Sequence, residues 1–322
     1  MEFMTLFGQM AALFLPVVVG YVAARTGFMD DGFDNQLSKV VLNVTLPCML
    51  VGSASSTEGL PDAVTSLQLL GLSTLGYVVA VALAYAVAWL LRAPARESGI
   101  DSFIIAFGNV GFIGYPVLSA ILGSKAVVYA AIANIPNLIF MFSFGIVMVH
   151  AAARACGGEG EATERPRSIG ATLRSSMKSI VSPTFFASLI LLGLVLLRVD
   201  NLGVLGEGLK TAGSLTTPAA LLVTGASLAN YNPLSMLTNW RAYAVAAARL
   251  LVVPVALLVV LGPLMADNYV RSIIVIGSAM PAATNAILFS LIYGVEPKPA
   301  LQGTFLTVIA SVITIPLVAM LV

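Results

Sequence analysis

The stretch FGNVGFIGYP, residues 107–116, places three glycines, an asparagine and a proline inside an otherwise apolar run. Glycine and proline weaken a helix, and in hydrocarbon each unpaired backbone group costs several kcal/mol. Irregular backbone therefore survives at membrane depth only where it is packed in protein or lines a wet cavity. The stretch indicates either a close helix contact or a deliberate break in a membrane-spanning helix.

The surrounding composition is that of an integral membrane protein. The 322 residues are 59% hydrophobic and 10% charged, against about 25% charged in ordinary soluble domains. A transmembrane helix needs about 20 apolar residues. We therefore expect an all-α membrane protein with ten transmembrane helices, at 4–24, 34–54, 67–91, 100–121, 126–151, 181–199, 208–230, 241–264, 270–293 and 301–321.

The basic residues predict the orientation. With ten spans, eleven of the 16 Lys and Arg residues fall in segments on one side of the membrane and four on the other. Short loops rich in Lys and Arg remain cytoplasmic. We expect a multi-pass protein of the inner or plasma membrane with both termini extracytoplasmic. The net charge of +1 gives no reason to expect a nucleic-acid partner.

An internal repeat divides the chain near its middle. The polar connection 155–179 separates a first half, 1–154, from a second, 180–322, and five spans in each half give the halves opposite orientations. LNVTLPCMLVGSAS (42–55) in the second span resembles GSLTTPAALLVTGAS (213–227) in the seventh. These features predict a 5+5 inverted repeat.

The ninth span carries a second interruption where the repeat predicts one. GSAMPAATNAI, residues 277–287, again combines small residues, proline and asparagine. Paired interruptions in matching positions of two halves indicate a transporter's binding site, because broken helices free backbone groups to meet a polar solute. Close helix packing through glycine is the alternative for either stretch alone.

GNVGFIGYP (108–116) together with MPAATNA (280–286) resembles the auxin efflux carrier family, which includes bacterial malate and malonate permeases. The resemblance covers essentially the whole chain and implies a fold related to the bile acid:sodium symporters. It implies a scaffold domain of spans 1, 2, 6 and 7 that forms a homodimer, and a mobile transport domain of spans 3–5 and 8–10. Spans 4 and 9 would then cross at unwound centres, near Gly114, Tyr115 and Pro116 and near Pro281 to Asn285.

Neutral polar groups are the main candidates for a site, because no Asp or Glu lies near the centre of any expected span. Intramembrane polar groups are costly and therefore functional candidates by default. Asparagine amides and the positive ends of half-helices together suit a carboxylate. The expected substrate-binding residues are Asn109, Gly114, Tyr115, Pro116, Asn134, Asn137, Pro281, Thr284, Asn285 and Arg249. Interhelical hydrogen bonding is the alternative role for each amide.

Arg249 is the one basic residue deep in an expected span. Its guanidinium could pair with an anionic substrate, or its side chain could extend toward the cytoplasmic surface. The small residues Gly52 to Ser55 would allow close approach of a second copy in a homodimer. No metal-ligand spacing, phosphate-binding loop or nucleophile triad is recognisable, so we expect neither an enzyme nor a cofactor.

These features favour a secondary transporter of a small organic anion, such as malate, malonate or an auxin-like acid, working by elevator-type alternating access. Coupling to sodium or protons remains open. One alternative is a sodium-coupled symporter of the bile acid type. Another is a sensor that binds a similar ligand without moving it, which would require an output domain or a charged tail.

Overall fold

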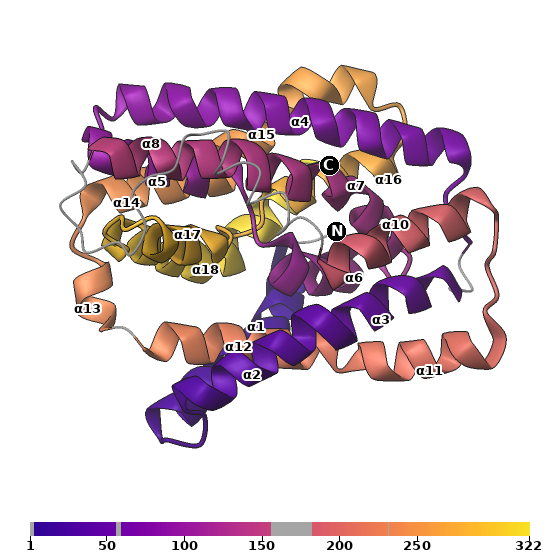
Figure 1. Cartoon of the computed structure of the whole chain (residues 1–322). Coiled ribbons are helices and arrows are strands. Elements are labelled where there is room, and N and C mark those ends of the chain that lie inside the picture. Colours follow the sequence, from indigo (N-terminus) through magenta and orange to yellow (C-terminus); the bar gives the residue numbers. More distant parts are fainter. Residues whose placement is uncertain (1–2, 56–58, 156–181, 231) are drawn as a thin grey trace.

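The computed structural model describes residues 3–55, 59–155, 182–230 and 232–322 (Figure 1). Within these ranges the chain is helical, and its single β-type pairing is an isolated antiparallel bridge between Gly108 and Ala282. The expectation of an all-α protein is thus confirmed for the described residues. Most of the expected connection 155–179 lies outside them.

The helices follow the apolar runs of the sequence. They are α1 (Phe3–Arg25), α2 (Asp31–Val40), α3 (Leu46–Gly52), α4 (Ala63–Leu90), α5 (Ala95–Ala106), α6 (Tyr115–Leu122), α7 (Ala126–Phe140), α8 (Ile146–Ala155), α10 (Pro183–Leu196), α11 (Gly203–Ser214), α12 (Thr216–Ala229), α13 (Pro233–Met236), α14 (Trp240–Ala247), α15 (Val253–Leu261), α16 (Asn268–Ser278), α17 (Asn285–Ile292) and α18 (Lys298–Ala319). π-Helical segments at Val41–Thr45, Val110–Gly114, Met141–Gly145 and Ala248–Val252 join several of them.

Seven continuous helical stretches of the described chain are long and apolar enough to cross a membrane. They are 3–25, 32–55, 63–90, 126–155, 203–229, 240–264 and 298–319. The three remaining expected spans fall on shorter helices: α10 covers the sixth, and the fourth and ninth are each divided in two. A multi-pass membrane protein is therefore supported, whereas the number of ten crossings stays a prediction.

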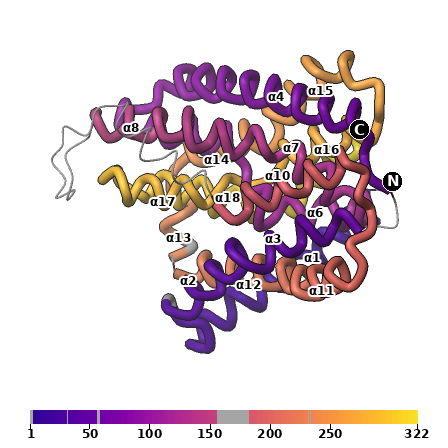
Figure 2. The backbone as a smooth tube through the Cα atoms, turned by 45° about the vertical axis from the view of Figure 1, so that its right-hand side comes forward, coloured from indigo at the N-terminus to yellow at the C-terminus, as the bar shows by residue number. Residues whose placement is uncertain are grey.

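α4 illustrates how these helices pack. It buries a stripe of small residues that includes Ser73, Gly76 and Ala80, and exposes large apolar ones such as Leu67 and Trp89. Helices in lipid approach through small residues and present large apolar side chains to the acyl chains. α4 lies along one edge of the molecule in both views (Figures 1 and 2).

Two groups of helices are visible in both views. α1, α2, α3, α11 and α12 gather on one side, and α4, α5, α7, α8, α14 and α15 on the other (Figure 2). α1 packs along α12, and α3 packs on both α10 and α11. The chain ends also lie near each other in both pictures.

Candidate functional site

The helix that contains the opening stretch is interrupted at residues 107–109. α5 ends at Ala106, Phe107 is extended, and helical structure resumes at Val110 as a π-helical turn that leads into α6. We expected the break at Gly114 to Pro116, and this position is wrong: Tyr115 and Pro116 form the first turn of α6. Pro116 is tolerated there because it directly follows the π-helical turn Val110–Gly114, whose wider geometry accommodates the missing proline N–H.

The second interruption spans residues 279–284, between the end of α16 and the start of α17. This agrees with the expected break near Pro281 to Asn285. Helix-free backbone at this depth must find other hydrogen-bond partners.

Backbone groups of the two interruptions form hydrogen bonds with each other. The backbone N–H of Asn109 donates to the carbonyl oxygen of Pro281 at 2.7 Å, and the backbone N–H of Ala283 donates to the carbonyl oxygen of Phe107 at 3.0 Å. The Ala282 N–H donates to Thr307 Oγ1 at 3.0 Å. Two segments more than 170 residues apart in sequence therefore form one small antiparallel element inside the helix bundle.

Four helix ends meet around this element. α5 and α16 reach it with their C-terminal ends, whereas the helix through Val110–Leu122 and α17 begin there. A helix carries roughly half a positive charge at its N-terminus and half a negative charge at its C-terminus. The element thus has two positive and two negative helix ends.

A cavity of about 540 Å³ adjoins the two N-terminal ends. Residues 108–112 line it from one break, and Ala283, Thr284 and Asn285 line it from the other. Its remaining walls come from the α2–α3 region, α7, the start of α10, α12, α17 and α18. Its polar lining residues are Asn35, Ser38, Asn43, Asn109, Asn134, Asn137, Ser182, Thr184, Thr224, Ser227, Thr284, Asn285 and Thr304. Among the described residues none of the lining side chains is acidic or basic.

Asn109 is held at the start of the resumed helix. Its side-chain Oδ1 accepts a hydrogen bond from the Phe112 N–H at 3.1 Å, as an N-capping residue does. The side chain is buried except for the part that lines the cavity. With Oδ1 engaged by the backbone, the group that Asn109 can offer a ligand is the Nδ2 donor.

Asn134 and Asn137 form a second polar group on α7. Asn137 Nδ2 donates to Asn134 Oδ1 at 2.8 Å, and Asn134 Nδ2 donates to the Tyr115 hydroxyl oxygen at 3.0 Å. Both amides are buried and both line the cavity. Asn137 Oδ1 is itself buried and has no partner among the described residues, which makes it a costly group in this wall.

The other expected site residues separate into two sets. Thr284 and Asn285 line the cavity, whereas Gly114, Tyr115, Pro116 and Pro281 are absent from its walls. Tyr115 contributes through its hydrogen bond with Asn134, and Pro281 through the carbonyl oxygen that orients Asn109. Sequence reasoning omitted Thr184 and Ser227 as site residues, although polar residues in apolar spans were the relevant signal.

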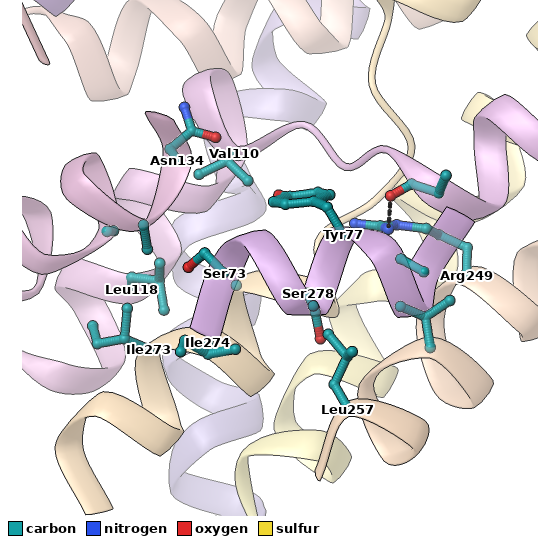
Figure 3. Close-up of a pocket in the computed structure, with 17 residues that line it drawn as sticks. Ser73, Tyr77, Val110, Leu118, Asn134, Arg249, Leu257, Ile273, Ile274 and Ser278 are labelled. Atoms are coloured by element: carbon teal, nitrogen blue, oxygen red, sulfur yellow. Dashed lines mark hydrogen bonds between the residues drawn. The ribbon is translucent and has the colours of Figure 1, made fainter. Parts of the chain in front are cut away.

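Arg249 is absent from the walls of the large cavity. It lines a separate cavity of about 50 Å³ with Tyr77 and Asn134, and Tyr77 lies between the other two in Figure 3. Its guanidinium donates from Nε to the Met280 oxygen at 2.9 Å, and from Nη1 to the oxygens of Ile105 and Ala106 at 3.1 and 3.2 Å. The dashed line in Figure 3 marks the bond to Ala106. The side chain is therefore buried at the helix breaks and does not extend to the surface.

Asp101 is a further polar residue whose position the sequence did not reveal. It lies in α5 with only 6% of its surface exposed, and its Oδ2 has no partner among the described residues. In the sequence it is the second residue of the span expected at 100–121, where an exposed place at the membrane surface would be ordinary. No cluster of three or more potential metal-ligating side chains occurs in the described part of the chain.

Long apolar helices around a cavity lined by broken helices define a multi-pass membrane protein. A family model described as "Membrane transport protein" matches residues 5–319, and the chain belongs to this auxin efflux carrier-type family of membrane transporters. A protein from Methanothermobacter thermautotrophicus, described as an uncharacterized transporter, is 25% identical over 321 residues, which cover 94% of this chain and 93% of that protein. The resemblance inferred from the two glycine-rich stretches is thereby confirmed.

Proposed function

We propose that this membrane transporter carries a small organic anion, a carboxylate such as malate, malonate or an auxin-like acid, bound in the cavity of about 540 Å³. The observation that carries the proposal is the convergence of two helix N-termini on one cavity whose described lining residues include no acidic side chain. Positive helix ends and amide donors together stabilise a carboxylate without a metal ion. Asn109, Asn285 and Thr284 lie at these ends, and Asn134 and Asn137 lie on the adjoining wall.

The transport unit in this proposal is the ten-span inverted repeat, in which spans 4 and 9 cross at their breaks. Pairs of helix contacts support the repeat: the first span packs on the seventh as α1 on α12, and the sixth packs on the second as α10 on α3. In a 5+5 repeat the first span corresponds to the sixth and the second to the seventh, so the two contacts are equivalent.

The domain division follows the same logic. Spans 1, 2, 6 and 7 would form the scaffold, and spans 3–5 and 8–10 would form the moving domain. The cavity draws its walls from spans 2, 6 and 7 on one side and from spans 4, 5, 9 and 10 on the other. A solute at such a junction is carried when one domain slides against the other, which is elevator-type alternating access.

Assembly as a homodimer through the scaffold is retained as part of the proposal. However, the small residues that suggested a homodimer contact other parts of the same chain. A Cβ added to Gly52 would come within 3.0–3.2 Å of Leu209 and Lys210 in α11, and Ser55 Oγ accepts a hydrogen bond from the Leu202 N–H. A second copy must therefore meet the scaffold elsewhere.

The test uses Asn109→Asp in the purified full-length protein. The carboxylate retains an oxygen to cap the Phe112 N–H but places a negative charge at the cavity, so carboxylate affinity should fall at least about tenfold. Binding of a series of mono- and dicarboxylates would be measured by calorimetry, and uptake by proteoliposomes.

Asn201→Asp is the matched control, because Asn201 is exposed before α11 and is absent from the cavity walls. Its carboxylate affinity should equal that of the wild type. Wild-type affinity in Asn109→Asp would overturn the proposed site. Binding without uptake in proteoliposomes would instead support a sensor.

A further inference from the structure

The positively charged guanidinium of Arg249 contacts the C-terminal ends of both interrupted helices. Arg249 donates three hydrogen bonds to oxygens at these ends: Met280 just beyond α16, and Ile105 and Ala106 at the end of α5. The side chain is only 2% exposed, and within the described residues no Asp or Glu forms a salt bridge with it.

The charges match. Each helix C-terminus carries about half a negative charge, so two ends together balance approximately one guanidinium. A buried cation without a counter-charge would be strongly disfavoured, and carbonyl oxygens are the recognised partners of intramembrane arginines. The arrangement therefore explains how a lone arginine is tolerated at this depth without a carboxylate.

The local sequence fits this role. Arg249 lies in the π-helical segment Ala248–Val252, and Pro254 follows shortly after it in α15. Pro254 offers no N–H to the preceding turn, which favours the wider π-helical geometry. At the break itself, a Cβ on Gly108 would overlap Arg249 Nη2, so the close approach of the guanidinium requires glycine at that position.

Carbonyl oxygens at unwound helix ends are also the ligands that a free coupling cation uses in transporters with broken helices. Here the guanidinium occupies them. We propose that Arg249 is a tethered cation which replaces such an ion, holds the two breaks together, and makes the site independent of sodium. Removing its side chain would open a binding site for a free cation. This inference concerns the ligand-free protein and does not depend on which anion the large cavity binds.

The experiment measures thermal unfolding of the ligand-free, full-length protein in choline, sodium or potassium chloride at equal ionic strength. The wild type should unfold at the same temperature in all three salts. Arg249→Ala should unfold roughly 5–15 °C lower, because the helix ends lose a buried charged partner. Millimolar methylguanidinium or sodium should restore part of this loss in Arg249→Ala and leave the wild type unchanged.

Arg241→Ala is the matched control, since Arg241 lies eight residues earlier and pairs with Glu97 at 3.4 Å in a partly exposed salt bridge. It should show no rescue by either cation. Sodium-specific stabilisation of the wild type, or an Arg249→Ala protein that no cation rescues, would overturn the inference.

If Arg249→Ala gives no folded protein, a double-mutant cycle with Gly108→Ala and Arg249→Lys carries the test. Lysine lacks the Nη2 group that a Cβ at position 108 would overlap. Gly108→Ala should therefore lower the unfolding temperature less in the Arg249→Lys protein than in the wild type. Equal losses in both backgrounds would show that the guanidinium does not occupy this place.

Discussion

At the scale of single residues, the site depends on how each buried amide is oriented. Asn134 accepts from Asn137 and donates to Tyr115, so one chain of hydrogen bonds links the cavity wall on α7 to the first turn of α6. Buried polar groups that satisfy one another fix a single geometry, whereas an unpaired member is costly. Asn134 satisfies both its neighbours in this way, whereas the buried Oδ1 of Asn137 has no partner among the described residues.

Tyr115→Phe should destabilise the protein by about 1–3 kcal/mol, because it leaves the buried Nδ2 of Asn134 with one acceptor fewer. Thermal unfolding in detergent would measure the change, with an expected decrease of a few degrees. Tyr85→Phe is the control: Tyr85 is 46% exposed on α4, and its unfolding temperature should be unchanged within error. Equal effects of the two substitutions would contradict the role given to the Tyr115 hydroxyl.

At the scale of helices, close packing through glycine brings α1 onto α12. A Cβ on Gly225 would overlap the Val17 carbonyl oxygen, and one on Gly20 would overlap the Leu222 oxygen. Each helix thus uses a glycine where the backbone of the other approaches it. Because α12 also lines the large cavity, this contact helps to position one of its walls.

Gly225→Ala should therefore separate α1 from α12 and cost about 1–3 kcal/mol or more, as overpacking does elsewhere. Gly193→Ala is the matched control, because Gly193 lies in α10 with no atom within 4 Å of an added Cβ. Its substitution should be neutral or slightly stabilising, since alanine is the better helix former. The unfolding temperatures of both variants, and their yield of monodisperse protein, would be compared. Unchanged stability in Gly225→Ala would argue against this packing.

At the scale of the whole molecule, the cavity lies where two groups of helices meet. Helices of one group and helices of the other both contribute to its walls, and the two breaks lie at its edge. The ten crossings that we propose, an even number, would place both termini on the same side of the membrane. An uneven number, such as the seven long apolar helices alone, would place the termini on opposite sides.

The ten-span topology predicts that Cys156 is cytoplasmic, since it follows α8 in the basic connection between the halves. In a Cys48→Ala protein, a membrane-impermeant maleimide should label Cys156 in inverted vesicles and not in right-side-out vesicles. A cysteine placed at Lys125, between α6 and α7, should show the opposite pattern in a background without native cysteines. Labelling of both positions from the same side would exclude this topology.

The sequence by itself determined the class of protein, the helical fold and the regions where helices are interrupted. Long apolar runs must form helices in lipid, and glycine, proline and asparagine at 107–116 and 277–287 mark backbone that cannot remain helical throughout. The exact place of the first break did not follow from composition, because a π-helical turn allows Pro116 to lie within the helix that resumes at Val110.

Only the tertiary structure decided which polar groups face one another. Sequence identifies an amide or a guanidinium as costly in a membrane, but its partner can lie in a distant segment, as Ile105 and Ala106 lie more than 100 residues from Arg249. Arg249 could have paired with a substrate or reached the surface, and the folded chain instead places it against the carbonyl oxygens of Ile105, Ala106 and Met280. Thr184 and Ser227 likewise became cavity residues only when α10 and α12 were packed around the breaks. Helix formation is local and readable from the chain, whereas the position of a site depends on long-range packing that no single segment encodes.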